Sequence, residues 1–266
     1  MKVSGKTVVV TGAGSGMGRE LTLELIKRGA KVAAVDLRVE TLAETANLAK
    51  ALGGVVATYA MDVSDAKAVS ELPVKVEKDL GPADALINNA GIIQPFVKVN
   101  DLDIDAAMRV MKVNFDGPLF LIKAFLPGLI ARPEAHLMNV SSMGAYAPVP
   151  GQSVYGASKA AIKLLTEGLR SELKPTGVGV TIVFPGAIAT NIAVNSGMVI
   201  PEGALENSKQ KTTAADVAAR QMVDAIEANK PRITIGPDAK IMDLLSRLNP
   251  VKAADIIYKQ MAGLLS

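Results

Sequence analysis

The sequence predicts one α/β domain, a doubly wound parallel sheet of seven strands with helices on both faces. Short β-branched apolar runs alternate with segments of helical spacing along nearly all of the 266 residues. The alternation contains no internal repeat, which favours an open parallel sheet over a repeat architecture. Hydrophobic residues make up 49% of the chain and charged residues 21%, which is enough for a large core and atypical of disorder.

The elements follow from local patterns. The first expected strand, residues 6–11, is short, β-branched and bounded by glycine. Further strands are expected at 31–35, 55–61, 84–87, 136–140, 179–184 and 232–235. Helices are expected at 19–28, 39–52, 65–80, 104–130, 153–174 and 214–228. Gly81-Pro82 ends the third helix, and Pro118 is expected to bend or break the fourth, because proline has no N–H to donate.

The composition excludes several classes of function. The absence of Cys removes disulfides, thiol catalysis and Cys-ligated metals, and the single His136 lies in an expected strand, so no metal site is predicted. Aromatic residues are 3% of the chain, so an aliphatic core is expected. A formal charge of +3 without a basic run argues against a nucleic-acid partner. No signal-peptide core and no run near membrane-spanning length is evident, so we expect a soluble cytoplasmic protein without a membrane partner.

A glycine-rich turn joins the first strand to the first helix. It reads Thr11-Gly12-x-x-x-Gly16-x-Gly18, and Met17 breaks the usual G-x-G-x-x-G spacing. Missing side chains let backbone amides approach a pyrophosphate at a helix N-terminus, so this turn predicts a dinucleotide site. A turn that only serves helix–strand packing is the alternative.

An acidic residue ends the second expected strand. Asp36 lies 24 residues after Gly12, where a carboxylate can accept both hydroxyls of the adenosine ribose and repels a 2′-phosphate. NAD is therefore predicted over NADP. Arg38 leaves room for NADP, because its guanidinium can receive a phosphate. A role for Asp36 as a helix cap is also open.

Polar or open turns follow other expected strands. Asp62-Val63 follows the third strand, the run 88–91 follows the fourth, and the run 185–190 follows the sixth. Carboxyl ends of parallel strands meet at one edge of the sheet, where α/β proteins bind ligands. Asn88 and Asn89 fit a structural role and a cofactor role equally well. Residues 191–212 are expected to cover a pocket, with a plain surface loop as the alternative.

One stretch carries candidate catalytic groups. Tyr155 and Lys159 lie one turn apart on a single face of an expected helix, so the ammonium is expected to lower the pKa of the phenol. A phenol tuned in this way suits proton transfer at an alcohol or carbonyl oxygen. Ser142 is expected at the carboxyl end of a strand, facing the same crevice. A surface Tyr–Lys pair without function is the alternative, and Asn114 has no function that its spacing indicates.

Taken together, these motifs resemble the short-chain dehydrogenase/reductase family, with its Rossmann fold, over nearly the whole chain. The resemblance implies hydride transfer between C4 of a nicotinamide and a carbonyl carbon. It implies that Tyr155 is the acid/base, that Lys159 holds the nicotinamide ribose and lowers the phenol pKa, and that Ser142 orients the substrate oxygen. Asn114 would hold a water behind Lys159.

The resemblance also implies the coenzyme contacts. Asp36 would bind the adenosine ribose, Asp62-Val63 the adenine, and Ile188 with Thr190 the nicotinamide amide. The full set of implied coenzyme residues is Gly12, Ser15, Gly16, Met17, Gly18, Asp36, Asp62, Val63, Asn89, Ala90, Gly91, Tyr155, Lys159, Pro185, Gly186, Ile188 and Thr190. A homotetramer or homodimer formed through helices 104–130 and 153–174 is implied by analogy.

The tail completes the prediction. Residues 1–240 are expected to form the domain, and 241–266 a helical tail whose apolar stripe packs on the pocket or on a sister subunit. The expected function is NAD-dependent oxidation of an apolar secondary alcohol or reduction of its ketone. An NADPH-dependent 3-oxoacyl reductase is the alternative enzyme, although the long apolar tail puts an acyl-carrier substrate in doubt. A dinucleotide-sensing binding protein without turnover is the alternative of another class.

Overall fold

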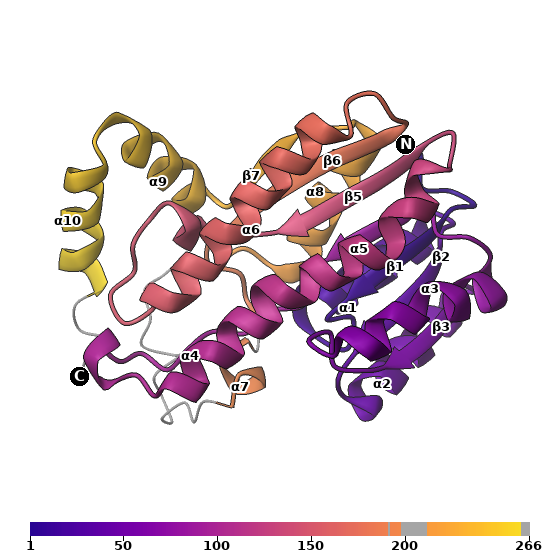
Figure 1. Ribbon diagram of the computed structural model, residues 1–266, viewed down its shortest axis with the longest axis horizontal. Helices are drawn as coiled ribbons and strands as arrows, with labels where there is room; N and C mark the ends of the chain where they lie inside the picture. The colour runs from indigo at the N-terminus through magenta and orange to yellow at the C-terminus, as the bar shows by residue number, and fades with distance from the viewer. Residues whose placement is uncertain (191, 198–211, 262–266) are drawn as a thin grey trace.

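The structure is a computed structural model that describes residues 1–190, 192–197 and 212–261, with side chains described up to residue 259. Its centre is a seven-stranded sheet in the order β3-β2-β1-β4-β5-β6-β7 with every pair of neighbours parallel (Figure 1). The strands are β1 Thr7–Thr11, β2 Lys31–Asp36, β3 Val55–Ala60, β4 Ala85–Asn88, β5 Ala135–Val140, β6 Val178–Pro185 and β7 Arg232–Ile235. The predicted doubly wound fold is confirmed.

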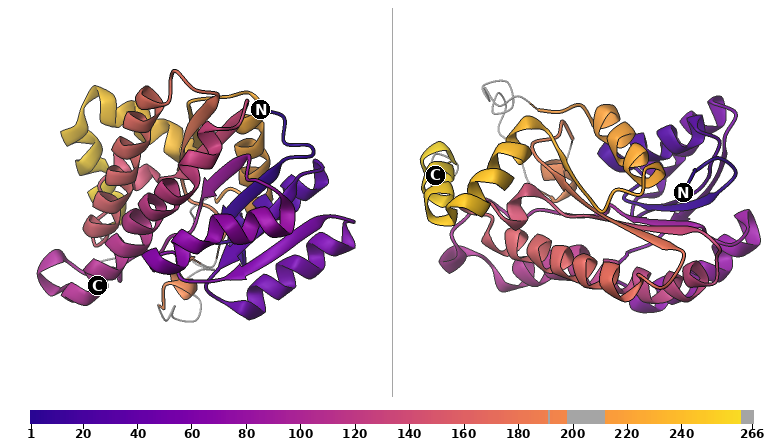
Figure 2. Two further views of the ribbon diagram at one scale, coloured as in Figure 1. Left: turned by 45° about the vertical axis from the view of Figure 1, so that its right-hand side comes forward. Right: turned by 90° about the horizontal axis from the view of Figure 1, so that it is seen from above.

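Helices cover both faces of the sheet, as the two views in Figure 2 show. One face carries α1 Gly16–Lys27, α2 Val39–Ala51 and α8 Ala215–Glu227. The other carries α3 Ala66–Leu80, α4 Ile104–Met111, α5 Gly117–Ile130 and α6 Ser153–Glu172. Successive strand residues point to opposite faces, so Val8 and Val10 enter one core and Val9 enters the other. Both cores are aliphatic, as the composition predicts.

The order of the strands fixes where a ligand site forms. The chain leaves β1 toward β2 on one side and later returns to β4 on the other side of β1. The connections on either side of β1 therefore diverge and leave a crevice at its carboxyl end. Thr11 ends β1 at this point, and its Oγ1 accepts hydrogen bonds from the backbone N–H of Asn89 and Ala90, both at 3.0 Å. The two turns that border the crevice are thus joined directly.

The expected break at Pro118 is a local change of helix type. A π-helical turn, Lys112–Asp116, joins α4 to α5, and Pro118 lies in the first turn of α5. Pro118 has no N–H for the carbonyl of Asn114 four residues earlier, and the wider turn keeps the helix continuous. The whole segment Ile104–Ile130 is long and apolar enough to cross a membrane, so the expectation that no run approaches that length is wrong. In this fold it is a core helix, because Leu121, Phe125 and Leu129 are buried against the sheet.

The tail forms two helices, α9 Pro237–Leu248 and α10 Pro250–Met261. The hydroxyl of Tyr146 donates to the carbonyl of Ala239 at 2.9 Å, which ties α9 to the segment after Ser142. The guanidinium of Arg232 in β7 makes two hydrogen bonds of 2.8 Å to the carboxylate of Asp243. Thus α9 is anchored to the edge of the sheet, while α10 packs mainly on α9.

Candidate functional site

A cavity of about 440 Å³ opens at the carboxyl ends of β1, β2 and β4. Its walls come from the glycine-rich turn, the end of β2, the turns after β3 and β4, and helices α4 and α7, where α7 is Ile192–Asn195. The predicted coenzyme residues that line it are Gly12, Ser15, Gly16, Met17, Gly18, Asp36, Asp62, Val63, Asn89, Ala90, Gly91 and Thr190. The structure therefore brings most of the predicted coenzyme-binding motifs together around one cavity.

The glycines are required by close backbone approach. Gly12 has φ +68°, a left-handed conformation that favours glycine. A Cβ on Gly18 would collide with the carbonyl oxygen of Gly12, and a Cβ on Gly12 would lie 3.0 Å from Ala90 Cα. Helix α1 starts at Gly16, earlier than the predicted Arg19, so its first amides face the cavity. This cradle fits a phosphate group at a helix N-terminus.

Asp36 faces the cavity from the end of β2. Its Oδ2 accepts the N–H of Gly14 at 2.9 Å, and its Oδ1 accepts the N–H of Arg38 at 3.2 Å. Helix α2 begins with Arg38 as its cap residue and without a side-chain capping bond, so the capping alternative for Asp36 does not hold. Asp62 accepts both the N–H (2.8 Å) and the hydroxyl (2.7 Å) of Ser64. Both carboxylates are thus oriented by backbone turns.

The two asparagines after β4 have different environments. Asn88 is buried in the sheet and donates to Asn139 Oδ1 at 2.8 Å, and Asn139 donates to Thr166 Oγ1 at 2.8 Å. Asn89 lines the cavity and donates to the carbonyl of Thr11 at 2.9 Å. Its Oδ1 is a buried acceptor without a donor among the residues that the structure describes. Asn88 Oδ1 likewise has no donor among those residues, but Asn88 does not line the cavity, so Asn89 is the one placed to meet a ligand.

Tyr155, Ser142 and Lys159 converge next to the turn after β4. Ser142 lies beside Tyr155, since a Cβ on Gly144 would lie 3.4 Å from both Ser142 Oγ and Tyr155 Cε1, and Ser142 Oγ accepts the N–H of Gly144 at 3.0 Å. Lys159 Nζ lies 6.0 Å from the centroid of the Tyr155 ring and donates to the carbonyl of Val140 at 3.0 Å. A Cβ on Gly91, which lines the cavity, would lie 3.1 Å from Lys159 Nζ. The three polar groups thus adjoin the cavity without forming its wall.

The pKa values of this group differ from the sequence expectation. Burial raises the pKa of Tyr155, and the neighbouring hydroxyl of Ser142 opposes that rise only in part. Burial also lowers the pKa of Lys159 to about 8. The expected lowering of the phenol pKa by the ammonium is therefore wrong for this state of the protein. Burial destabilises both the phenolate form of Tyr155 and the ammonium form of Lys159. The helical spacing of the two residues does not reveal this burial.

Asn114 ties two parts of the site together from the π-helical turn. Its Oδ1 accepts the N–H of Ile92 at 2.9 Å, and its Nδ2 donates to the carbonyl of Ile92 at 2.9 Å and to Ser158 Oγ at 3.0 Å. Ser158 precedes Lys159 on α6, so this amide links that helix to the turn after β4. Both N–H groups of its side chain bond to protein atoms, and its role in holding a water stays a prediction.

Gln94 is a site residue that sequence reasoning missed. It is fully buried, and its Oε1 accepts the backbone N–H groups of Val154 (2.9 Å) and Tyr155 (3.0 Å). Its Nε2 donates to the carbonyl of Gly151 at 2.8 Å. The first N–H groups of a helix have no partner within the helix, so Gln94 caps α6 from a distance of about sixty residues. No local pattern signals this contact.

The run after β6 contributes less than predicted. Pro185, Gly186 and Ile188 do not line the cavity, whereas Thr190 does. The N–H of Gly186 donates to the carbonyl of Ile235 at 2.9 Å, and the N–H of Ala187 donates to Asp238 Oδ2 at 2.7 Å. Asp238 at the start of α9 thus fixes this turn, a second contact that the sequence did not indicate. The predicted cover, 191–212, lies largely outside the described residues, but Ile192 and Asn195 of α7 line the cavity.

Within the described ranges, no group of three or more His, Asp or Glu side chains is placed to hold a metal ion. The polar groups of the site are backbone amides, carboxylates, amides, a phenol and an amine. They suit recognition of a dinucleotide and proton transfer at a bound oxygen.

Comparison with known proteins agrees with this geometry. The family profile described as short chain dehydrogenase matches residues 6–198. A Mycobacterium bovis protein named as a probable oxidoreductase, EphD, is 36% identical over 259 residues, which cover 92% of this chain and 44% of that protein. The chain therefore spans less than half the length of that curated relative.

Solved structures share the whole fold. A short-chain dehydrogenase/reductase from Burkholderia phymatum in complex with NAD has a TM-score of 0.83 at 27% identity, covering 94% of this chain and 98% of the other. A short-chain dehydrogenase from Burkholderia cenocepacia in complex with NADP has a TM-score of 0.81 at 29% identity, covering 97% and 99%. One of these two similar structures thus contains NAD and the other NADP.

Proposed function

Because the chain belongs to the short-chain dehydrogenase/reductase family, we propose that it is an NAD-dependent oxidoreductase that interconverts apolar secondary alcohols and their ketones. The observation that carries the proposal is that Lys159, whose Nζ lies 6.0 Å from the Tyr155 ring, lies beside Gly91 at the wall of a glycine-lined cavity. An acid/base phenol and a dinucleotide site are thereby adjacent.

The residues present fit a nicotinamide dinucleotide. The cavity offers close backbone approach at Gly12 and Gly18, carboxylates at Asp36 and Asp62, and a buried acceptor on Asn89 that lacks a protein donor among the described residues. When bound, the nicotinamide ring gives or accepts a hydride at its C4. Asp36 supports NAD, because its carboxylate can accept ribose hydroxyls and repels a 2′-phosphate.

The proton is handled by this chain's own residues. In ketone reduction, Tyr155 donates its hydroxyl proton to the substrate oxygen while Ser142 holds that oxygen by a hydrogen bond. In alcohol oxidation, the phenolate accepts the proton of the hydroxyl group. Because burial raises the Tyr155 pKa, the phenol is protonated near neutral pH, which supports reduction there and oxidation at higher pH. Lys159 binds the nicotinamide ribose, and Asn114 keeps α6 in place beside it.

An apolar substrate is supported by the surroundings of Ser142. The segment that follows it contains Ala145, Ala147 and Val149, and α9 packs beside it through Tyr146. An NADPH-dependent 3-oxoacyl reductase and a dinucleotide sensor remain the competing functions.

A substrate panel separates these functions. Secondary alcohols and ketones of graded size are incubated with NAD or NADP in the matching redox state, and absorbance of the reduced nicotinamide is followed. The proposal expects turnover that rises with apolar size and a higher kcat/KM with NAD(H). Preference for NADPH with 3-oxoacyl substrates would favour the reductase of lipid synthesis. Tight coenzyme binding without turnover of any substrate would favour the sensor.

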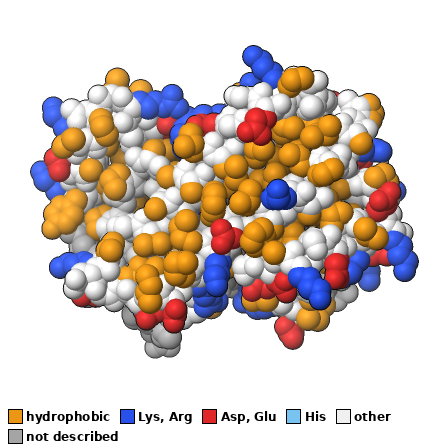
Figure 3. All heavy atoms as spheres, in the orientation of Figure 1, with side chains coloured by type: hydrophobic (Ala, Val, Ile, Leu, Met, Phe, Trp, Pro, Cys, Tyr) orange, Lys and Arg blue, Asp and Glu red, His pale blue; other side chains and the backbone are white. Residues whose placement is uncertain are grey.

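Assembly through the long helices is part of the proposal. The face of α4, α5 and α6 carries exposed apolar side chains, which Figure 3 shows as orange patches on the side toward the viewer. They include Ile104, Met108, Ile130 and Leu164. We expect a dimer or tetramer in light scattering, and a Leu164→Glu variant should dissociate because a charge would enter the apolar contact.

A further inference from the structure

Asn195 of α7 bridges two walls of the coenzyme cavity. Its Oδ1 accepts a hydrogen bond from Arg38 Nη2 at 2.7 Å, and its Nδ2 donates to Ser15 Oγ at 2.9 Å. All three residues line the cavity. One amide therefore links the glycine-rich turn, the end of β2 and α7, which lie far apart in the sequence.

The bridge adjoins the carboxylate assigned to the adenosine ribose. Arg38 is two residues from Asp36, and its backbone N–H donates to Asp36 Oδ1 at 3.2 Å. The guanidinium of Arg38 is the cation at this corner that is placed to receive a 2′-phosphate, but it is bonded to Asn195. Arginine binds phosphate more strongly than it binds an amide oxygen, so a 2′-phosphate would compete for this guanidinium.

We propose that Asn195 determines coenzyme specificity: by holding the Arg38 guanidinium on α7, it favours NAD(H) and disfavours NADP(H). NAD binding leaves the Ser15–Asn195–Arg38 bridge intact. Asn195 engages Nη2 of Arg38, so an NADP 2′-phosphate that pairs in a bidentate way through Nη2 has to detach Arg38 from Asn195 and gives up one of the bonds that fasten α7 across the cavity. The inference deepens the proposed function and rests on its dinucleotide site.

Helix α7 has a second attachment that does not involve Arg38. Ser196 Oγ accepts the N–H of Ile93 at 3.0 Å and donates to the carbonyl of Ile192 at 2.7 Å. Loss of the Asn195 side chain should therefore leave α7 attached to the turn after β4. A variant at position 195 consequently tests the bridge and not the folding of the segment.

The test is a double-mutant cycle on coenzyme binding, which needs no substrate. Dissociation constants for NADH and NADPH are measured by calorimetry for the wild type, Asn195→Ala, Arg38→Gln and the double variant. Asn195→Ala should shift the ratio of the two constants toward NADPH by about tenfold, because a bond to a charged group of roughly 1.5 kcal/mol no longer opposes phosphate binding. In the Arg38→Gln background the same substitution should leave the ratio unchanged.

Two further variants sharpen the cycle. Asn195→Asp should move the ratio toward NADH, because a carboxylate pairs with Arg38 and repels a phosphate. Val194→Ala, an exposed neighbour on α7 that does not line the cavity, should leave both constants unchanged. The inference is overturned if Asn195→Ala leaves the ratio unchanged, or if it shifts the ratio equally with and without Arg38. If the wild type binds neither coenzyme, the proposed function itself fails.

Hydrogen exchange gives an independent readout. Amides of residues 192–197 should exchange faster in the NADPH complex than in the NADH complex of the wild type, because only NADPH detaches Arg38. The difference should vanish in Arg38→Gln. Equal exchange in the two wild-type complexes would contradict the coupling.

Discussion

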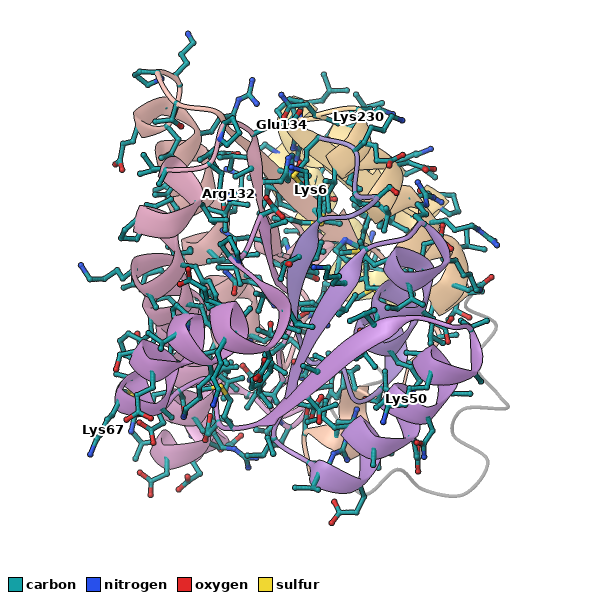
Figure 4. The ribbon with its side chains drawn as sticks, turned by 90° about the vertical axis from the view of Figure 1, so that its right-hand side faces the viewer. Lys6, Lys50, Lys67, Arg132, Glu134 and Lys230 are labelled. Carbon is teal, nitrogen blue, oxygen red and sulfur yellow. The ribbon has the colours of Figure 1, made fainter. Side chains whose placement is uncertain are left out.

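The two ends of the sheet use charged groups in opposite ways. At the amino ends of the strands, Asp84 accepts the N–H of Thr7 at 3.0 Å and an ion pair from Arg132 at 2.8 Å, with Lys6 Nζ at 3.5 Å. Figure 4 shows Lys6, Arg132, Glu134 and Lys230 gathered at this end. At the carboxyl ends, Lys159 is buried with a pKa lowered to about 8, and Asn89 keeps an acceptor without a donor among the described residues.

The difference separates stability from function. At the amino end the buried carboxylate of Asp84 is paired with Arg132 and Lys6 and also bonds the backbone of β1, so it helps to hold the strands in register. Polar groups at the carboxyl end are desolvated and incompletely bonded, a state that costs stability and persists where a ligand or substrate can complete the bonding. Substitutions at the two ends should therefore affect different measurements.

The largest expected effect is on activity, at Tyr155. Tyr155→Phe should lower kcat by about 10²–10⁴-fold, because the proton donor is lost. Its melting temperature and its dissociation constant for NADH should stay close to those of the wild type, since only a hydroxyl is removed. Stopped-flow absorbance and calorimetry measure the two quantities. Turnover at the wild-type rate would remove Tyr155 from the proposed mechanism. It would also contradict the assignment of function to the carboxyl ends of the strands.

The matching effect on stability is expected at Asp84. Asp84→Ala should lower the free energy of unfolding by about 2–3 kcal/mol, because the buried N–H of Thr7 and the guanidinium of Arg132 both lose their acceptor. Asp84→Asn keeps an acceptor for either the Thr7 N–H or the Arg132 guanidinium, so it should lower the free energy of unfolding by less. Urea unfolding measures both, and kcat of the folded fraction should be unchanged. A loss of kcat without a loss of stability would break the comparison.

His136, near the amino end of β5, predicts an acid-sensitive component of stability. The Thr181 hydroxyl donates to the carbonyl of Lys230 (2.6 Å), so His136 Nε2 carries the hydrogen and donates to Thr181 Oγ1 (2.8 Å). Burial lowers the pKa of His136 to about 3 from an ordinary value of 6.5. As pH falls below 6.5, the unfolded chain binds a proton that the folded protein does not, so stability falls until pH about 3.

The measurement is unfolding free energy against pH for the wild type and His136→Gln. From pH 7 to pH 5 the wild type should lose about 2 kcal/mol more than the variant, at roughly 1.4 kcal/mol per pH unit below the unfolded pKa. Glutamine keeps a donor toward Thr181, so the two proteins should differ less in unfolding free energy at neutral pH than at pH 5. Parallel pH curves for the two proteins would show that His136 does not titrate in this way.

The smallest expected effect is at Gln94, which positions Tyr155 by capping α6 at the carboxyl end of the sheet. Gln94→Ala should lower kcat about tenfold, because the N–H groups of Val154 and Tyr155 lose their buried acceptor and the phenol is less well positioned. Gln94→Glu keeps that acceptor and should retain more of the activity. The dissociation constant for NADH should not change in either variant. Equal activity of Gln94→Ala and the wild type would contradict this positioning role.

Much of the fold and part of the site were predictable from local chemistry. The alternation of strands and helices, the order of polar turns at strand ends and the glycine-rich turn each depend on a few neighbouring residues. The cavity contains Asp36, Asp62 and Asn89 because parallel strands place their carboxyl ends together. Wrong expectations concerned the Tyr155 pKa, which burial raises, and the segment Ile104–Ile130, which is long and apolar enough to cross a membrane.

By itself, the sequence determined which residues can bind a dinucleotide and transfer a proton, because these needs are met by short motifs with a fixed spacing. Only the tertiary structure decided how those motifs are held. Gln94 caps α6, Asp238 fixes the turn after β6, and Asn195 joins Ser15 to Arg38. Such contacts join segments far apart in the chain, and their energies depend on removal from water. The spacing of residues along the chain does not show which distant segments come into contact or which side chains are buried.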